Sequence, residues 1–333
     1  MAAYLGVDLG ATTIRAVVGD RAGRVTGSHR TPTPQGPTGL AITESVLDAT
    51  REACADAGVA PAALVAAGIG AIGPLDPHDG AAVDPTNLPD SVDHIPLVGP
   101  LSTLLSTDRI TFHNDATAGA IGERFFGDGA DDLVYLTLST GIGAGAIVDG
   151  HVLSGWDGNA AEVGHVTVDP DGRRTCGCGG AGHWEAYCSG ANVPDYARDL
   201  HAGAEAAASR SGDDDASGET RLPLADPAFD AADVFDAADT DAFAARVVDR
   251  IADWNTIGVA TLVHAYAPRR VVVGGGVAIN HPDRVLDPIR ERLPARVATN
   301  VPELRLTQRG DSAVVEGALA SAITRGTGDP ERR

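Results

Sequence analysis

The chain has 333 residues, a formal net charge of −21 at pH 7, and 43% hydrophobic but only 4% aromatic residues. This length allows two domains that share a cleft, around a core rich in small side chains. No apolar run is long enough to span a bilayer, which excludes a membrane protein, and the negative charge argues against binding to nucleic acid, whose phosphates it would repel.

Residues 3–30 predict an antiparallel meander of three strands. The segments YLGVDLG and TTIRAVVGD flank a turn at Gly10–Thr13, and RVTGSHR follows a second turn at Asp20–Gly23. Residues 38–58 then predict a helix that ends at Gly58, because apolar side chains recur there at helical spacing: Leu40, Val46, Leu47 and Ala53.

The next segments predict two more strands and a helix. VAAGIGAIGPLD is typical of a buried strand that runs into a Gly/Pro turn. RITFHND predicts a strand that ends at Asn114–Asp115, and ATAGAIGERFFG continues from it as a helix.

The opening pattern recurs from Leu133. LVYLTLSTGIGAGAIVDGHVLSG again predicts a strand, a small-residue turn, a strand, an Asp-Gly turn and a strand. Two copies of one unit about 130 residues apart indicate two related domains that face each other. Each copy places a Gly- and Thr-rich turn where backbone N–H groups can converge on an anion.

The last third of the chain predicts a surface loop, two helices and a strand. The Ala-, Asp- and Ser-rich stretch from about Ala202 to Asp241, which includes SGDDDASGE, is typical of a solvated loop flanked by helix. ARVVDRIADWNTIGVATLVHAYA predicts a helix, and RRVVVGGGVAIN a buried strand that ends in three glycines. A final helix is expected from about Ser312 to Thr324, with Asp311 as its N-cap.

Every one of the 25 basic residues is Arg. An acidic chain without Lys suits a salt-rich cytoplasm, which predicts a halophilic source; codon bias towards GC-rich codons is the alternative. The N-terminal segment MAAYLGVDLG has neither a basic n-region nor a long apolar h-region, and the chain has only four cysteines. We therefore expect a cytoplasmic protein in a reducing compartment.

The segment EVGHVTVDPDGRRTCGCGGAGHWE concentrates metal-binding side chains. Four thiol and imidazole groups, the ligands that tetrahedral zinc prefers, occur in it: His165, Cys176, Cys178 and His183. A Cys-x-Cys disulfide would close an unusually tight ring, and ordinary solvated histidines are the other alternative. Glu162 and Glu185 flank the set, and we expect a structural zinc that holds them towards a polar substrate.

Three glycine turns follow predicted strands, in DLGATT, LSTGIGAG and VVVGGGVA. None is a Walker loop, because no GK[ST] is present, but together they indicate one nucleotide held between two domains. Asp8, beside the first turn, is placed to hold a magnesium ion directly or through water; its alternative role is to cap the turn.

Asn114 and Asp115 end a strand, where ligand sites of α/β sheets lie. The carboxylate of Asp115 could accept a proton from a substrate hydroxyl, as phosphoryl transfer requires. Asn114 offers both a donor and an acceptor to sugar hydroxyls. The alternative is that this pair only caps the following helix.

These motifs together resemble the ROK family of sugar kinases and repressors over nearly the whole chain. The resemblance is carried by GVDLGATT, GIGAIGPLD, NLP at Asn87–Pro89, HNDATAGAIGE, STGIGAGAIVDG, GNAAEVGH, CGCGGAGHWEAYCSG and VVVGGGVA. It implies the α/β, two-domain actin-like ATPase (ribonuclease H-like) fold with a nucleotide/sugar cleft between the domains. Residues 1–115 and a C-terminal helix at about 312–326 would form the small domain, and residues 116–311 the larger one.

The resemblance also implies roles for individual residues. Asp115 would be the base for the sugar 6-hydroxyl, and the other hydroxyls would be held by Asn114, Glu162, His165 and Glu185. The phosphate loops would be Asp8, Gly10, Thr12 and Thr13, and Thr137, Thr140, Gly141 and Gly143, with Gly274, Gly275 and Gly276 near the adenosine. One ring nitrogen of His165 would bind zinc, and the other would contact the sugar.

The chain departs from the family pattern at a few positions. His183 stands where a third cysteine is usual, so we expect a Cys2His2 zinc site. Ala11 replaces a common glycine, and Thr13 stands where Lys often follows.

The implied activity is that of an ATP-dependent hexokinase, most similar to the glucokinases. Kinases for N-acetylmannosamine, N-acetylglucosamine, fructose or allose, or a non-catalytic sugar-responsive regulator, are the alternatives. The regulators carry a helix-turn-helix ahead of the first strand, and here that strand begins by Tyr4. ATP, magnesium and zinc are the implied cofactors, and a homo-oligomer, dimer or tetramer, is expected.

Overall fold

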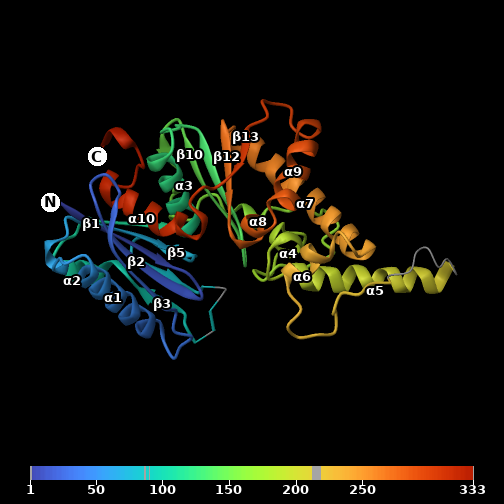
Figure 1. The fold of residues 1–333 in the computed structure, drawn as a ribbon, viewed down its shortest axis with the longest axis horizontal. Helices are drawn as coiled ribbons and strands as arrows, with labels where there is room; N and C mark the ends of the chain where they lie inside the picture. The colour runs from blue at the N-terminus through green and yellow to red at the C-terminus, as the bar shows by residue number, and fades with distance from the viewer. Residues whose placement is uncertain (1, 86–87, 90, 212–218, 333) are drawn as a thin grey trace.

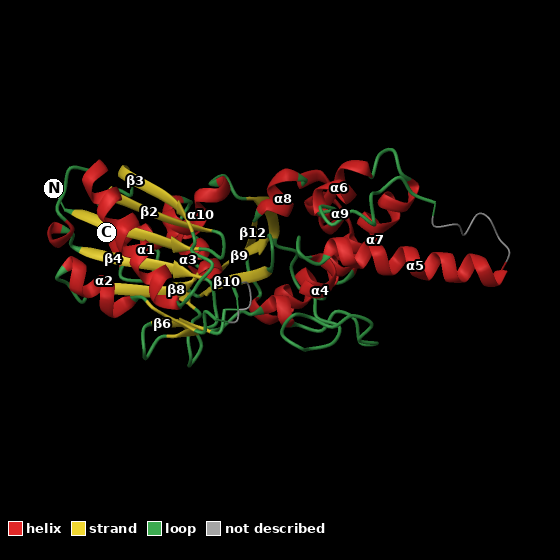
Figure 2. Cartoon of the chain, turned by 90° about the horizontal axis from the view of Figure 1, so that it is seen from below, coloured by secondary structure: helices red, strands yellow, loops and turns green. Residues whose placement is uncertain are grey.

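A computed structural model describes residues 2–85, 88–89, 91–211 and 219–332. Asn87 of the NLP motif and most of the SGDDDASGE stretch lie outside the described residues. Two five-stranded sheets lie next to each other along the long axis of the molecule, each with helices packed on it (Figures 1 and 2). We call each sheet with its helices a lobe. None of the described helices is both long and apolar enough to cross a membrane.

The first sheet contains the predicted meander. Its strand order is β3-β2-β1-β4-β8, with β1 (Ala3–Leu9), β2 (Thr13–Asp20), β3 (Val25–Pro32), β4 (Ala66–Ala71) and β8 (Ile110–Asn114). β1 to β3 are antiparallel neighbours, whereas β4 and β8 run parallel to β1. Side chains alternate between the faces of a strand. Leu5 therefore joins the core under α1 (Gly39–Asp56) and α2 (Val98–Leu105), whereas Tyr4 packs with α10 (Ala313–Thr324).

The second sheet repeats this topology. Its order is β11-β10-β9-β12-β13, with β9 (Leu133–Leu138), β10 (Ile142–Val148), β11 (His151–Val152), β12 (Arg270–Gly274) and β13 (Glu303–Leu306). Three antiparallel strands are again followed by two parallel ones. The repeat predicted from Leu133 is therefore confirmed in the strand order.

The remaining elements surround these sheets. A small sheet beside the first lobe consists of β5 (Leu75–Asp76), β6 (Ala81–Val83) and β7 (His94–Pro96). The other helices are α3 (Asp115–Phe126), α4 (Glu185–Cys188), α5 (Val193–Ser211), α6 (Ala231–Ala237), α7 (Ala242–Tyr266), α8 (Gly276–Asn280) and α9 (Pro282–Arg292).

Helices α3 and α10 cross between the two sheets. α3 starts at the end of β8 in the first sheet and packs on β9 and β10 of the second, whereas α10 follows the second sheet and packs on β1 and β4 of the first. The helices touch at Gly122 and Gly317, where a Cβ on Gly317 would overlap the carbonyl oxygen of Ala118. This exchange places Asp115, the first residue of α3, at the junction of the lobes.

The helix expected over residues 38–58 is confirmed as α1, although Leu40 in its first turn is 62% exposed. One local prediction was wrong. Asp311 is not the cap of α10. The helix begins at Ala313, after a 3-10 turn (Gly310–Ser312), and the Asp311 carboxylate instead accepts a hydrogen bond of 2.8 Å from Arg15.

Candidate active site between the lobes

Asn114 both caps a helix and extends into the junction. Its Oδ1 accepts a hydrogen bond of 2.7 Å from the Thr117 N–H, as an N-cap does. Its Nδ2 donates to Glu162 Oε1 at 3.4 Å, which reaches the second lobe. The capping and the site interpretations of this residue are therefore compatible.

Asp115 is a half-buried carboxylate at the start of α3. Its Oδ1 accepts a hydrogen bond of 2.7 Å from the Ala116 N–H. Burial raises the pKa of Asp115, and the hydrogen bonds from nearby backbone N–H groups oppose that shift. A carboxylate that holds its proton more tightly than in water is a better general base.

The buried Asp8 pairs with the half-buried Arg15, within electrostatic reach of Asp115. The two residues lie opposite each other in the β1–β2 register, with Arg15 Nη1 3.5 Å from Asp8 Oδ2. Asp8 is 7% exposed. Its pKa is raised to about 7, mainly by burial and further by the charges of Asp115 and Asp311, although the nearby Arg15 lowers it. Sequence reasoning missed Arg15, although counting outward from the Gly10–Thr13 turn pairs it with Asp8.

Glu162 and His165 face this site from the second lobe, on the 3-10 turn η2 (Val163–His165) and the residue before it. His165 Nε2 lies 3.9 Å from Glu162 Oε2, and its Nδ1 lies 3.7 Å from Cys176 Sγ. Partial removal from water raises the pKa of Glu162 despite His165, and the charges of Asp115 and Glu185 add to the rise. His165 thus has one ring nitrogen towards Cys176 and the other towards Glu162.

The four predicted metal ligands converge. One donor atom from each of His165, Cys176, Cys178 and His183 lies within 4.8 Å of the others, and Cys178 Sγ is 3.2 Å from His183 Nδ1. Bonds of 2.0–2.3 Å in a tetrahedral zinc site put ligand atoms roughly 3.3–3.8 Å apart. The donor set therefore fits zinc after a small contraction. The disulfide alternative is not realised, because all four cysteines are free.

Glu185 connects this cluster to the second glycine turn. It is the first residue of α4, and its Oε2 accepts a hydrogen bond of 2.8 Å from the Ile142 N–H. Its Oε1 lies 3.8 Å from Cys176 Sγ. Besides the predicted contact with substrate, this carboxylate therefore has structural partners on two segments of the second lobe.

The predicted phosphate loops are tight turns between strands. In the first, the Gly10 N–H donates to the Thr13 carbonyl at 3.0 Å; in the second, the Ser139 N–H donates to the Gly141 carbonyl at 2.9 Å. The hydroxyl-bearing residues at their tips, Thr12 and Thr140, are exposed. Thr137 and Gly143 lie opposite each other in the β9–β10 register.

Gly276, the last of the three glycines at the end of β12, lines a cavity of about 370 Å³. Gly275 has φ +87°, and a Cβ there would overlap the Leu138 carbonyl, so both conformation and space require glycine. Gly276 and Thr140 line the cavity, together with three residues that sequence reasoning missed: Phe235, Asn280 and His281. The rings of Phe235 and His281 stack with their centroids 4.8 Å apart.

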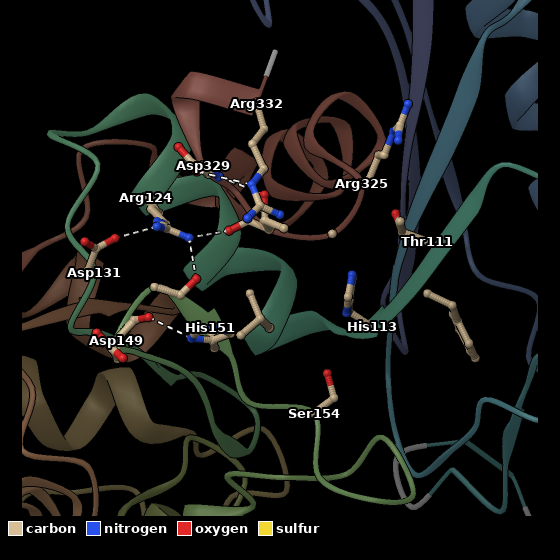
Figure 3. A pocket seen from close by; sticks show the side chains of 15 residues that line it. Thr111, His113, Arg124, Asp131, Asp149, His151, Ser154, Arg325, Asp329 and Arg332 are labelled. Carbon is tan, nitrogen blue, oxygen red and sulfur yellow. Dashed lines mark hydrogen bonds and ion pairs between the residues drawn. The ribbon is translucent and has the colours of Figure 1, made fainter.

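A second cavity, of about 530 Å³, lies between β8, the β10–β11 turn and the end of α10 (Figure 3). None of the predicted site residues lines it. Arg124 of α3 lines this cavity and forms an ion pair with Asp131. Its guanidinium also donates to the carbonyls of Gly150 at 2.8 Å and Thr327 at 2.9 Å. This guanidinium joins the C-terminal segment to the second sheet.

Comparisons with known proteins identify the family of this chain. The model of the ROK family matches residues 4–325. A glucokinase of Pyrobaculum calidifontis is 35% identical over 322 residues, which cover 97% of this chain and 95% of that protein.

Two solved structures are similar over almost their whole length. The ROK family glucokinase of Streptomyces griseus, in complex with glucose and AMPPNP, has 31% identity and a TM-score of 0.74, over 96% of this chain and 99% of that one. The ROK hexokinase of Thermus thermophilus has 33% identity and a TM-score of 0.75, over 96% and 97%.

Proposed function

This chain belongs to the ROK family, and we propose that it is an ATP-dependent glucokinase, which phosphorylates glucose at the 6-hydroxyl. The observation that carries the proposal is the position of Asp115. This carboxylate with a raised pKa lies at the lobe junction, next to the Asn114–Glu162 bridge and within electrostatic reach of Asp8. Full-length similarity to proteins named glucokinase supports glucose as the substrate.

In the proposed reaction, Asp115 accepts the proton of the 6-hydroxyl as that oxygen attacks the γ-phosphorus. The amide of Asn114 and the polar side chains of Glu162, His165 and Glu185 hold the remaining hydroxyls. Closing the lobes around both substrates would exclude water, which would otherwise hydrolyse ATP. The turns at Gly10–Thr13 and Ser139–Ile142 supply backbone N–H groups for the phosphates, apart from those of Gly10, Ser139 and Ile142, which already donate within the protein.

The nucleotide is proposed to place its adenosine in the cavity beside Gly276 and its phosphates towards the two turns. Magnesium would be held by Asp8, directly or through water, and would neutralise charge on the phosphates. Asp8 fits this role because, among the residues that the structure describes, its buried carboxylate pairs with a single cation, Arg15 at 3.5 Å. Arg15 also supplies positive charge where the family often has a Lys at the position of Thr13.

Zinc is proposed to occupy the cluster of His165, Cys176, Cys178 and His183 in a structural role. All four positions of a tetrahedral site would then be taken by protein ligands, as in closed structural sites. The ion would fix the ring of His165 so that its Nε2 faces the sugar. The 3.7 Å separation between His165 Nδ1 and Cys176 Sγ supports this orientation.

A coupled assay with a panel of sugars tests the proposed function. At high potassium chloride, glucose should give the highest kcat/KM, above N-acetylmannosamine, N-acetylglucosamine, fructose and allose. Turnover of another hexose without turnover of glucose would refute the glucokinase assignment and leave the sugar kinase class in place. ATP consumption without any phosphorylated sugar would refute both.

A further inference from the structure

We propose that Asn159 is a positioning residue that fastens the sugar-binding segment of the second lobe to Leu75 at the start of β5, just after β4 of the first lobe. The inference rests on the proposed function, because it concerns the wall that carries Glu162 and His165. It adds to the site a residue that does not itself contact substrate.

The contact is made by one side-chain amide and one backbone residue. Asn159 Oδ1 accepts a hydrogen bond of 2.8 Å from the Leu75 N–H, and Asn159 Nδ2 donates one of 3.0 Å to the Leu75 carbonyl. An amide offers a donor and an acceptor side by side, whereas an ionised carboxylate only accepts. Asp cannot replace Asn here without losing one bond, and Gln is one methylene longer.

Both ends of this bridge lie next to the proposed chemistry. Leu75 begins β5, four residues after Ala71, and Ala71 pairs with Asn114 in the parallel β4–β8 register. On the other side, Asn159 precedes Glu162 by three residues, and Glu162 accepts the hydrogen bond from Asn114. Two bridges, Leu75–Asn159 and Asn114–Glu162, therefore connect one short segment to the carboxyl end of the first sheet.

The loop before Asn159 is shaped for this contact. Gly158 has φ +84°, and a Cβ on it would press against the ring of Pro77, so the loop lies tightly on the first lobe. The Asp157 carboxylate accepts a hydrogen bond of 3.1 Å from the Asn159 N–H, and the Asp157 carbonyl accepts one of 3.1 Å from Asn159 Nδ2. These bonds orient the amide before it meets Leu75.

Loss of the bridge should affect the sugar more than the nucleotide, because the nucleotide-binding turns lie on other segments. For Asn159→Ala we expect KM for glucose to rise roughly tenfold, as the loss of one or two neutral hydrogen bonds implies, while KM for ATP stays within about twofold. Asn300→Ala removes an exposed amide from the loop before β13 and is the matched control. It should leave both constants unchanged.

Asn159→Asp gives a second, independent readout. A protonated carboxyl has one donor and one acceptor, like the amide, whereas the ionised form repels the Leu75 carbonyl. The ratio of kcat/KM for N159D to that of the wild type should therefore rise as pH falls from about 6 towards about 4, the ordinary pKa of an aspartic acid side chain. A ratio independent of pH, together with a wild-type KM for glucose in N159A, would overturn the proposal.

Hydrogen exchange at the Leu75 amide separates this inference from the proposed function, because it needs no turnover. The amide should exchange faster in N159A than in the wild type and in N300A. Unchanged protection of Leu75 would refute the bridge even in an active kinase. Faster exchange in a protein that phosphorylates no sugar would support the bridge and refute the function.

Discussion

Asp8 is the residue whose ionisation should respond most directly to pH. Its pKa is raised from 3.8 to about 7, mainly by burial, so the carboxylate is largely protonated near pH 6 and ionised near pH 8. Because magnesium favours the ionised form, the KM for magnesium–ATP should fall as pH rises over this interval. Steady-state kinetics across the interval measure this dependence.

Two variants check the assignment of that dependence to Asp8. Asp8→Asn should remove the pH dependence of KM for magnesium–ATP, together with most of the activity. Arg15→Gln should shift its midpoint to higher pH, because the guanidinium 3.5 Å away no longer stabilises the charge. A midpoint near pH 7 that neither substitution moves would show that another group titrates.

The raised pKa of Asp8 also predicts how the thermal stability of the metal-free protein depends on pH. Since the folded-state pKa lies above the unfolded value, the contribution of Asp8 to the free energy of unfolding is fully present below pH 3.8 and is lost as pH rises through about 7. The melting temperature of metal-free D8N, relative to that of the wild type, should therefore increase over this range. Thermal melts of both proteins at matched pH would show a constant difference if Asp8 were not perturbed.

At the scale of elements, the crossing of α3 and α10 depends on glycine. Gly317→Ala would place a methyl group onto the Ala118 carbonyl and should lower the free energy of unfolding by about 1–3 kcal/mol. Gly99→Ala in α2 is the matched control. Beyond its chain neighbours and its own helix backbone, no described heavy atom lies within 4 Å of the added Cβ, so the higher helix propensity of Ala should stabilise by up to about 1 kcal/mol. Denaturant unfolding that ranks the two variants in the opposite order would contradict this packing.

The segment from Glu162 to Glu185 should depend on its metal. Elemental analysis should find about one zinc ion per chain, and Cys178→Ser should reduce that content, whereas His183→Cys should retain it. Removing the ion should lower the melting temperature and raise KM for glucose, because His165 loses its fixed orientation. Absence of zinc from protein purified without chelator would refute the site.

Sequence patterns predicted most of the elements because hydrophobic period and turn residues act locally. The meander, the copy of it from Leu133 and the helix after Asp115 follow from such patterns. Contacts between distant segments carry no such signal. The Arg15–Asp311 pair and the Asn159–Leu75 bridge join residues 296 and 84 positions apart, and only the fold brings them together.

For the molecule as a whole, the division into two domains at Asp115 and the formation of a homo-oligomer stay predictions. The division is supported by the two large sheets, because the strands of one come from residues before Asp115 and those of the other from residues after it. It is also supported by α10, which packs on the first sheet. Sedimentation analysis of the purified protein would test the second.

The charge of −21 makes a prediction about salt. Repulsion between surface carboxylates should be screened more completely as ionic strength rises, because the Debye length falls from about 10 Å at 0.1 M to about 3 Å at 1 M. The melting temperature should therefore increase with potassium chloride up to at least about 1 M. A melting temperature that falls over this range would argue against salt adaptation.

The most direct test of the central claim is the pair of measurements on Asp115→Asn: turnover of glucose with ATP, and binding of glucose by calorimetry. The substitution keeps the size of the side chain but removes the base, so kcat should fall by about 10²–10⁴ while glucose still binds with an affinity within a few-fold of that of the wild type. A variant that binds glucose and phosphorylates it at the wild-type rate would contradict the role assigned to Asp115.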